Sequence, residues 1–221
     1  MPPRNHKTWL KTPKVEHISS EIYSSYEVYK QEQENIFSKV WVPMCHLSEI
    51  PEPGNFRTTS IAGTNVIAIN RGYMGIQAYI NPGKYTTPSG YISRAQFYMD
   101  DYVKIHTEVK HGQMVWVTLD PNPTQSVEEW TAGAFDCIAD AIDTEELDVF
   151  HYHKAVIDTN YKLWHDTNSE FYHDFMHYFN RVSGFNDEYF ARKNIPFDNG
   201  HVNVSSFTVN YEEYDGFEDR G

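Results

Sequence analysis

The sequence NFRTTSIAGTNVIAINRGYMGIQAYI occupies residues 55–80, and its pattern sets the fold class of the first half of the chain. Residues 56–61, 65–70 and 75–80 are three short runs rich in β-branched, aromatic and other apolar residues, separated by two glycine-containing turns. Short strands that alternate with turns at this spacing are typical of a small antiparallel sheet or barrel. We therefore expect a β domain around this stretch.

The flanking sequence sets the limits of this domain. A polar arm over residues 1–15 leads into a predicted helix over 19–38, and strand-like sequence begins at Trp41. Residues 103–119 alternate like a further hairpin with His111-Gly112 at its turn. The sequence DPNP at 120–123 then breaks the chain. We predict an N-terminal arm and helix over 1–40, a β domain over 41–122 and a separate region over 123–221.

The region after residue 122 mixes helix and strand patterns. Its periodicity predicts helices over 127–142 and 161–181, a helical turn over 187–193, and strands over 150–158 and 201–211. The fold class expected for the whole chain is therefore α+β.

Composition excludes several classes of function. The chain of 221 residues has 31 acidic and 18 basic residues, a net charge of −13 that disfavours binding to nucleic acid. Its only cysteines are Cys45 and Cys137, so no disulfide framework organises it, and a reducing compartment is favoured. No apolar run reaches the roughly 20 residues of a membrane span, and the N-terminus lacks a secretion signal. We expect a cytoplasmic protein that binds neither nucleic acid nor membrane.

The stretch DTNSEFYHDFMH at residues 166–177 carries the chemistry. At about 100° per residue, one narrow arc of a helix here collects two carboxylates and two imidazoles: Asp166, Glu170, His173 and His177. The opposite face collects aromatic residues that would bury it: Trp164, Phe171, Phe175 and Phe179. Buried polar groups need partners, and a metal ion satisfies all four at once. Two histidines with a carboxylate and open positions describe the Fe(II) site of non-haem oxygenases.

Other interpretations of these residues stay open. Histidines on an aromatic-rich helix can simply form hydrogen bonds inside a core. Glu170-x-x-His173 also matches half of a di-iron carboxylate site, but a second such motif is missing. The pairs His106/His111 and His151/His153 are more typical of sheet or surface positions. Cys45-His46 lies beside a turn and favours a packed thiol over a ligand.

Three segments carry a resemblance to a known family. Residues 41–57 (WVPMCHLSEIPEPGNFR) resemble the opening of the Rieske domain in large (α) subunits of ring-hydroxylating, Rieske-type non-haem iron oxygenases. Residues 115–121 (VWVTLDP) resemble the strand that closes that domain. The sequence NYKLW at 160–164, followed by Glu170-x-x-His173, resembles the start of the iron-binding catalytic domain. The resemblance covers most of residues 20–220.

The resemblance implies a set of roles. His173 and His177 match the two histidine ligands of a mononuclear Fe(II), and Glu170 matches the acidic residue that links this iron to a neighbouring subunit's cluster. Asp166 has no assigned role and is a candidate to support the ligands. The fold implied is a small antiparallel Rieske-like domain followed by part of a helix-grip-like α+β domain.

The resemblance also implies the reaction and its partners. The expected activity is hydroxylation of a small organic substrate by O₂ and NADH, with methanesulfonate or another short alkanesulfonate as the substrate. The implied partners are a small (β) subunit and a ferredoxin or reductase, in a homo- or hetero-oligomer.

The sequence departs from the family pattern at the cluster. A Rieske [2Fe–2S] cluster needs two cysteines and two histidines, which the family supplies as Cys-x-His and Cys-x-x-His; neither motif is present. Where the first would follow Asn81, the chain passes directly to Pro82, as if a segment were excised. The family's third iron ligand, a downstream aspartate, is expected beyond Gly221.

Three hypotheses follow. The leading one is an incomplete Rieske-type oxygenase large subunit that is inactive or badly impaired by itself. The second is a non-catalytic structural or regulatory descendant. Retention of Glu170, His173 and His177 argues against the second. The third is a zinc- or iron-binding module with no oxygenase role.

Overall fold

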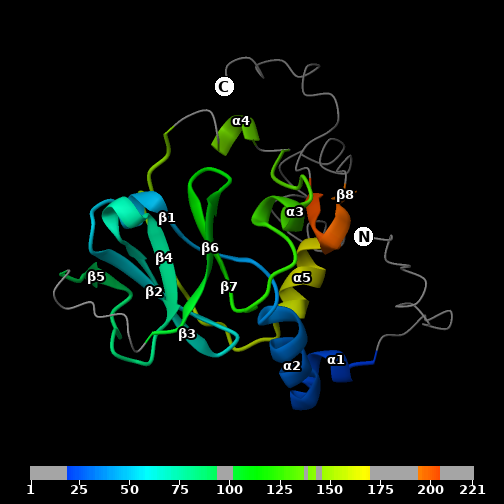
Figure 1. Cartoon of the computed structure of the whole chain (residues 1–221). Coiled ribbons are helices and arrows are strands. Elements are labelled where there is room, and N and C mark those ends of the chain that lie inside the picture. Colours follow the sequence, from blue (N-terminus) through cyan, green and yellow to red (C-terminus); the bar gives the residue numbers. More distant parts are fainter. Residues whose placement is uncertain (1–18, 94–101, 137–138, 143–145, 170–193, 205–221) are drawn as a thin grey trace.

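The computed structural model describes residues 19–93, 102–136, 139–142, 146–169 and 194–204, and it consists of a curled sheet flanked on one side by helices (Figure 1). Neighbouring strands of this seven-stranded sheet are antiparallel, in the order β1-β7-β6-β4-β3-β2-β5. Its strands are β1 (Val42–His46), β2 (Asn55–Ile61), β3 (Thr64–Asn70), β4 (Ile76–Ile80), β5 (Ser89–Tyr91), β6 (Lys104–Lys110) and β7 (Met114–Thr118). The predicted antiparallel β fold of this region is confirmed.

Strand β3 lies within the core of the sheet. Its residues 66–69 are all buried, and alternate side chains enter two different apolar clusters. Val66 and Ala68 pack with Cys45 and Val115, whereas Ile67 and Ile69 pack with Phe56 and other aromatic residues. Because successive side chains of a strand point to opposite faces, a run of apolar residues indicates that both faces of β3 are covered.

The turns of the sheet lie where the sequence predicts them. The hairpin between β6 and β7 turns at His111 and Gly112, which both have positive φ angles (49° and 64°). Strand β5 begins within residues 81–90 (NPGKYTTPSG), whose composition is typical of a loop. Gly90 allows this pairing: a Cβ atom there would lie 2.9 Å from the ring of Phe56 on the neighbouring strand β2.

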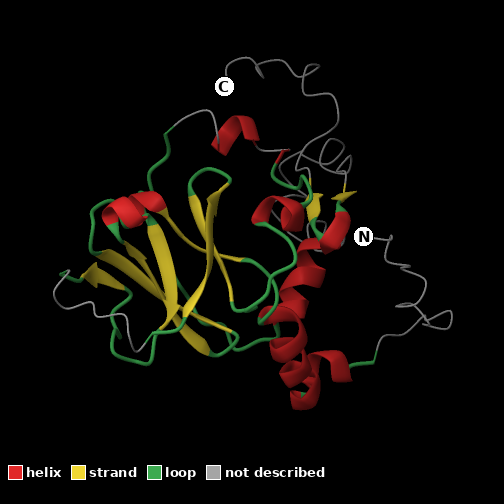
Figure 2. Cartoon of the chain, in the orientation of Figure 1, coloured by secondary structure: helices red, strands yellow, loops and turns green. Residues whose placement is uncertain are grey.

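The predicted N-terminal helix is confirmed, as two short helices and a π-helical turn (Figure 2). Helices α1 (Glu21–Ser24) and α2 (Tyr26–Glu32) are separated by Ser25, whose ψ of 124° ends α1. The Ser25 side chain accepts a hydrogen bond from the amide of Val28, which caps α2. The single-turn elements are η2 (Gln33–Phe37, π-helical) and the 3₁₀ turns η3 (Leu47–Glu49), η4 (Gly72–Met74) and η6 (Asp198–Gly200).

The helix predicted over 127–142 is confirmed at its two ends, as α3 (Val127–Thr131) and α4 (Ala139–Ile142), but the prediction that it is continuous is wrong. The interruption begins at Ala132, which takes the left-handed conformation at φ 52°, and continues at Gly133 with φ 83°. A left-handed residue followed by glycine ends an α-helix in the usual way. The helical periodicity of the sequence therefore continues past a position where the helix itself ends.

The prediction of a strand over 150–158 is also wrong. All residues from 146 to 159 are exposed, and no described strand pairs with this segment. Two contacts hold it against the sheet domain: the Val149 amide donates to Ser48 Oγ at 2.9 Å, and the Arg57 guanidinium lies 4.5 Å from the centre of the Tyr152 ring. Alternation of apolar residues alone does not make a strand, because a strand needs a hydrogen-bonded neighbour.

The remaining described elements are α5 (Tyr161–Ser169) and the hairpin of β8 (Asn194–Pro196) and β9 (Val202–Val204). The predicted helix over 161–181 is confirmed as far as residue 169, and the strand predicted over 201–211 is confirmed over 202–204. The rest of both segments and the helical turn predicted over 187–193 lie outside the described residues. With sheet and helices together, the α+β class is confirmed. Among the described helices, none is both long and apolar enough to cross a bilayer.

Candidate functional site

Helix α5 leads toward the predicted iron ligands. Glu170, His173 and His177 follow its last described residue, Ser169, and lie outside the described residues. Their convergence on one ion therefore stays a prediction. The structure shows helix α5 and the contacts that fix its position.

Asn160 sets the first turn of α5. Its side-chain Oδ1 accepts a hydrogen bond from the amide of Lys162 at 3.0 Å, and its backbone carbonyl accepts one from Leu163 at 3.0 Å. Asparagine is favoured at this position because its side chain satisfies an amide that has no partner within the helix. The Asn160 Nδ2 group donates to the carbonyl of Tyr23 at 2.9 Å, which joins the start of α5 to helix α1.

Helix α2 and the following π-helical turn pack against the first turn of α5. The Lys162 ammonium lies 2.7 and 2.9 Å from the two carboxylate oxygens of Glu32, and these side chains are only 18% and 12% exposed. The ring of Tyr161 meets the ring of Phe37 edge to face, with centroids 5.0 Å apart. Burial, with a further contribution from Glu32, raises the pKa of Tyr161. These contacts fix both the position and the rotation of α5.

Asp166 is the described member of the predicted arc of polar residues. Its Oδ2 accepts a hydrogen bond of 2.6 Å from the hydroxyl of Tyr23. This hydrogen bond is the main reason why the pKa of Tyr23 is raised, because loss of the phenolic proton would leave two anions facing each other. Asp166 therefore contacts helix α1 with its side chain.

The aromatic residues on the face opposite this arc are predicted to be buried, but the described one, Trp164, is exposed. Trp164 is 66% exposed and Leu163 is 45% exposed. Helices α1 and α2 cover the side of α5 that carries Lys162 and Asp166. The other aromatic residues of that face, Phe171, Phe175 and Phe179, lie outside the described residues.

The pair Cys45-His46 has a structural role, as the sequence favours. Cys45 is 3% exposed in the core between β1 and β7, and burial, helped by the Glu49 carboxylate, raises the pKa of its thiol to about 12. The His46 ring has Ser48 Oγ 2.9 Å from Nδ1 and the Gly112 carbonyl 2.8 Å from Nε2. A thiol that resists ionisation and an imidazole with both nitrogens engaged do not suit a metal.

The remaining histidines that the sequence singles out do not converge. His106 bonds a backbone carbonyl at 3.1 Å, and His111 bonds Thr131 Oγ1 at 3.0 Å. His151 and His153 lie in the exposed segment. Within the described residues, no three histidine, cysteine or acidic side chains gather closely enough to hold a metal ion.

A tight loop closes the sheet at the point where the cluster motif would follow. Asn81, 4% exposed at the end of β4, donates from Nδ2 to the carbonyl of Tyr85 at 2.6 Å. Its Oδ1 accepts from the amides of Gly83 at 3.2 Å and Tyr85 at 3.4 Å. The Tyr85 ring packs on Phe56, 5.4 Å away, in the aromatic cluster of the sheet. Residues 81–85 therefore form a compact turn anchored in the core.

Cys137 lies outside the described residues, so it offers no described ligand.

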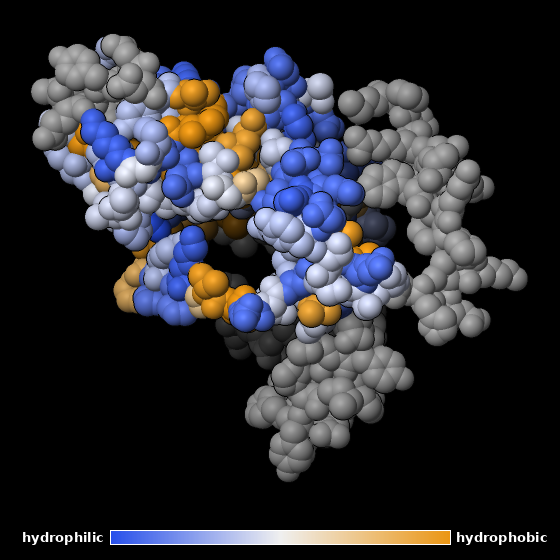
Figure 3. All heavy atoms as spheres, turned by 90° about the horizontal axis from the view of Figure 1, so that it is seen from below, coloured by the Kyte–Doolittle hydropathy of each residue, from blue (hydrophilic) through white to orange (hydrophobic). Residues whose placement is uncertain are grey.

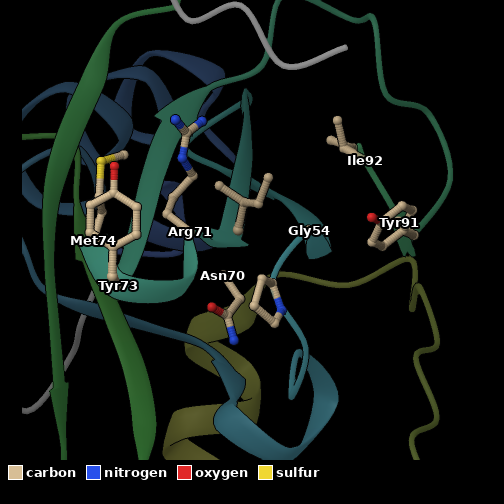
Figure 4. A pocket seen from close by; sticks show the side chains of 9 residues that line it. Gly54, Asn70, Arg71, Tyr73, Met74, Tyr91 and Ile92 are labelled. Carbon is tan, nitrogen blue, oxygen red and sulfur yellow. The ribbon is translucent and has the colours of Figure 1, made fainter. Parts of the chain in front are cut away.

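Two of the hollows on the described surface lie beside the sheet and the N-terminal helices. One of about 460 Å³ has Tyr73 and Met74 on one side, Tyr91 and Ile92 on the other, and Arg71 between them (Figure 4). None of the described residues that line it carries a carboxylate, thiol or imidazole, and its ionisable side chains are those of Arg71, Tyr73 and Tyr91. The other, of about 790 Å³, lies between the N-terminal helices and residues 120–130. Seen from below, the molecule is hollowed near its centre, where polar and apolar residues mix (Figure 3).

Comparison with known proteins gives similarity across the whole chain. No family model matches it. The chain is 43% identical to the methanesulfonate monooxygenase hydroxylase subunit alpha of Methylosulfonomonas methylovora, over 100% of this chain and 64% of that protein. It is 31% identical to the 2-aminobenzenesulfonate 2,3-dioxygenase subunit alpha of Alcaligenes sp, over 92% of this chain and 61% of that protein. The chain thus spans less than two thirds of either relative.

Solved structures share the fold. A quaternary ammonium Rieske monooxygenase in complex with an inhibitor matches with a TM-score of 0.65 and 20% identity, over 80% of this chain and 58% of that chain. A naphthalene 1,2-dioxygenase from Rhodococcus sp. bound to indole matches with a TM-score of 0.60 and 21% identity, over 71% of this chain and 44% of that chain. At such identities the likeness concerns the fold alone.

The alignment with the first relative also contains gaps in this chain. It runs over 267 positions and this chain has 221 residues, a difference of 46 positions in which the relative has residues and this chain has none. A difference of this size is consistent with the excised segment that the sequence suggests.

Proposed function

Because this chain belongs to the large (α) subunits of Rieske-type non-haem iron oxygenases, we propose that it carries the iron-binding helix of a monooxygenase that hydroxylates a small organic substrate. The observation that carries this proposal is the 43% identity along the entire chain to a methanesulfonate monooxygenase hydroxylase alpha subunit. Helix α5, which the Glu170-x-x-His173 motif follows directly in the sequence, agrees with it.

We propose methanesulfonate, or another short alkanesulfonate, as the substrate. Hydroxylation of the methyl carbon of methanesulfonate gives hydroxymethanesulfonate, whose C–S bond then breaks to leave formaldehyde and bisulfite. With O₂ as oxidant, one oxygen atom enters the substrate and the other leaves as water. NADH supplies the two electrons, and one proton is consumed with them.

The residues proposed for iron are His173 and His177, with Glu170 on the path of electrons. An Fe(II) held by these two neutral imidazoles would keep positions open for O₂ and substrate, which is the chemistry the metal would supply when bound. The chain's own contribution in the described part is placement. Asn160 fixes the start of α5, and Lys162 ties its first turn to helix α2.

The [2Fe–2S] cluster of the family does not fit this chain. Four ligands are needed, two cysteines and two histidines. The chain has two cysteines; Cys45 is buried with a pKa of about 12, and the imidazole of its neighbour His46 is bonded at both nitrogens. No electron transfer through a cluster of this chain is proposed. NADH-driven turnover therefore needs electrons from a partner, for which we propose a ferredoxin or reductase. A small (β) subunit is the second proposed partner, in a homo- or hetero-oligomer.

Hydrogen peroxide tests the function without an electron donor, because it supplies both the oxygen atom and the oxidising equivalents. Methanesulfonate and peroxide balance to formaldehyde, bisulfite and water. We expect the Fe(II)-loaded full chain to release formaldehyde from methanesulfonate slowly, because only two protein ligands hold its iron, and the His173→Ala and His177→Ala variants to release none above background. Formaldehyde is the readout because peroxide oxidises sulfite. An iron-loaded chain that forms no formaldehyde would contradict the proposed substrate, and equal activity in the variants would contradict the proposed ligands.

A further inference from the structure

The hollow of about 460 Å³ lies at one end of the sheet, where three loops meet. These are the loop before β2, the turn between β3 and β4, and the end of β5. Because these strands are antiparallel, all three loops lie at the same end. Asn81 follows the other end of β4, so the hollow is separate from the place where the cluster-bearing segment is missing.

Hydrogen bonds between the loops hold the hollow in shape. The Gly54 amide donates to the Asn70 carbonyl at 2.8 Å, and the Ile92 amide donates to the Gly54 carbonyl at 2.8 Å. The Asn70 side chain donates from Nδ2 to the carbonyls of Ile50 at 2.9 Å and Pro51 at 3.1 Å. The three loops are therefore fixed to one another, so the lining is preformed, as in most ligand sites.

Two tyrosines form walls on opposite sides of the hollow (Figure 4). Gly54, at φ 100°, sets the place of Tyr91, because a Cβ atom at residue 54 would lie 2.6 Å from the Tyr91 ring. On the other side, Tyr73 and Met74 belong to the turn η4. Tyr91 and Tyr73 are 65% and 86% exposed, so both offer aromatic surface to a ligand.

Arg71 lies between these walls, and it is the one charged residue among the described residues that line the hollow. Its positive charge acts on its surroundings: burial raises the pKa of Tyr79, and Arg71 opposes that rise. The chain as a whole carries a net charge of −13, which repels small anions. A hollow that combines a cation with no described carboxylate is therefore a place where this acidic chain can accept an anion.

The lining also indicates the kind of anion. A guanidinium presents a planar set of N–H donors that matches two oxygens of a carboxylate or sulfonate. Pro53, Ile69 and Ile92 add apolar surface beside the aromatic walls. A volume of about 460 Å³ lies in the range of small-molecule sites. These features together suit a small molecule with one charged end and an apolar body.

We propose that this hollow binds a small organic oxyanion, a sulfonate or a carboxylate. Its charged end meets Arg71, and its apolar body lies between Tyr73 and Tyr91. The described lining residues all fall within 53–92, so this site does not use the predicted iron ligands. The inference therefore stands independently of the proposed function.

The test measures binding of benzenesulfonate and benzoate to the metal-free full chain by saturation-transfer NMR at constant ionic strength. We expect saturable binding of at least one of them, and the stronger of the two shows which oxyanion is preferred. Benzenesulfonamide, a neutral molecule of nearly the same shape, should bind at least about tenfold more weakly, because it cannot form a charge-assisted pair with Arg71. This comparison needs no variant.

Three variants locate the site. Arg71→Gln should weaken binding of the acid at least about tenfold, and Tyr73→Ala about threefold through loss of an aromatic wall. Lys104→Gln is the matched control, because it removes the same charge from an exposed position on β6 outside the hollow, and it should bind as the wild type does.

Three results would overturn the inference: no saturable binding to the wild type, equal binding of the acid and the sulfonamide, or equal binding by the Arg71 and Lys104 variants. The double variant His173→Ala/His177→Ala separates this site from the proposed iron site, and it should bind the acid normally. If it loses binding while Arg71→Gln keeps it, the acid binds at the iron helix, which also overturns the inference.

Discussion

Replacing Asn81 with alanine should measurably destabilise the sheet domain, because this side chain closes the loop at the point where the cluster-bearing segment is missing. The donor bond from Nδ2 to the Tyr85 carbonyl, at 2.6 Å, contributes about 1 kcal/mol, and the acceptor bonds at 3.2 and 3.4 Å contribute a few tenths each. The Tyr85 carbonyl, left without its donor in a half-buried position, adds about 1 kcal/mol more. Water can reach the exposed Gly83 amide, which limits the total.

The expected loss is therefore about 2–3 kcal/mol of unfolding free energy, or roughly 5–10 °C in Tm for a chain of this size. Urea unfolding followed by circular dichroism measures it, and Asn122→Ala, at an exposed position, is the control with an expected change below about 0.5 kcal/mol. A loss for Asn81→Ala no greater than that of the control would refute this reasoning, since the loop would then not depend on Asn81.

Two further predictions concern charge and pH. Lys162→Met should lower the unfolding free energy by about 2 kcal/mol, because it leaves the largely buried Glu32 carboxylate without its cation. Lys30→Met, which removes an exposed ion pair 3.7 Å apart, should lower it by less than about 0.5 kcal/mol in the same urea experiment. Equal losses would contradict the packing of α5 on α2. Cys45, with its pKa raised to about 12, should resist iodoacetamide at pH 8 in the folded protein and react once it is unfolded, as mass spectrometry of its peptide would show. Because its folded-state pKa lies above the unfolded value of about 8.5, the stability that it contributes should be complete below that pH and decline as the pH rises toward 12. Rapid labelling of the folded protein at pH 8 would disprove its burial.

The sheet could be predicted from the sequence because its signals are local. Each of the strands β2 to β4 combines apolar residues with a turn on either side, and the His111-Gly112 turn marks the last hairpin. Strand β5 could not be predicted in this way. Its residues read as a loop, and it exists because Gly90 leaves room for Phe56 on the neighbouring strand.

Two predictions fail in the second half, the continuity of the helix over 127–142 and the strand over 150–158, and their physical causes differ. The break at Ala132-Gly133 carried a local signal, the glycine, which the helical periodicity around it obscured. The segment 150–158 has an alternating apolar pattern that predicts a strand. Its residues are nevertheless exposed, and none of the described strands pairs with it.

In the candidate site, too, local features can be predicted from the sequence and contacts between distant residues cannot. Helical spacing suffices to place Asp166, Glu170, His173 and His177 on one arc, because that depends only on the period of the helix. The contact from Tyr23 to Asp166 spans 143 residues of sequence, so no local pattern could indicate it.

Metal analysis combined with EPR tests the central claim most directly. After loading with Fe(II) under anaerobic conditions and removal of excess metal, the full chain should retain about one iron. The double variant His173→Ala/His177→Ala should retain none, and the reduced wild type should give no [2Fe–2S] signal. Iron retained by the double variant, or a reduced-cluster signal from the wild type, would contradict an account in which this chain holds a single iron through two histidines of one helix and no cluster.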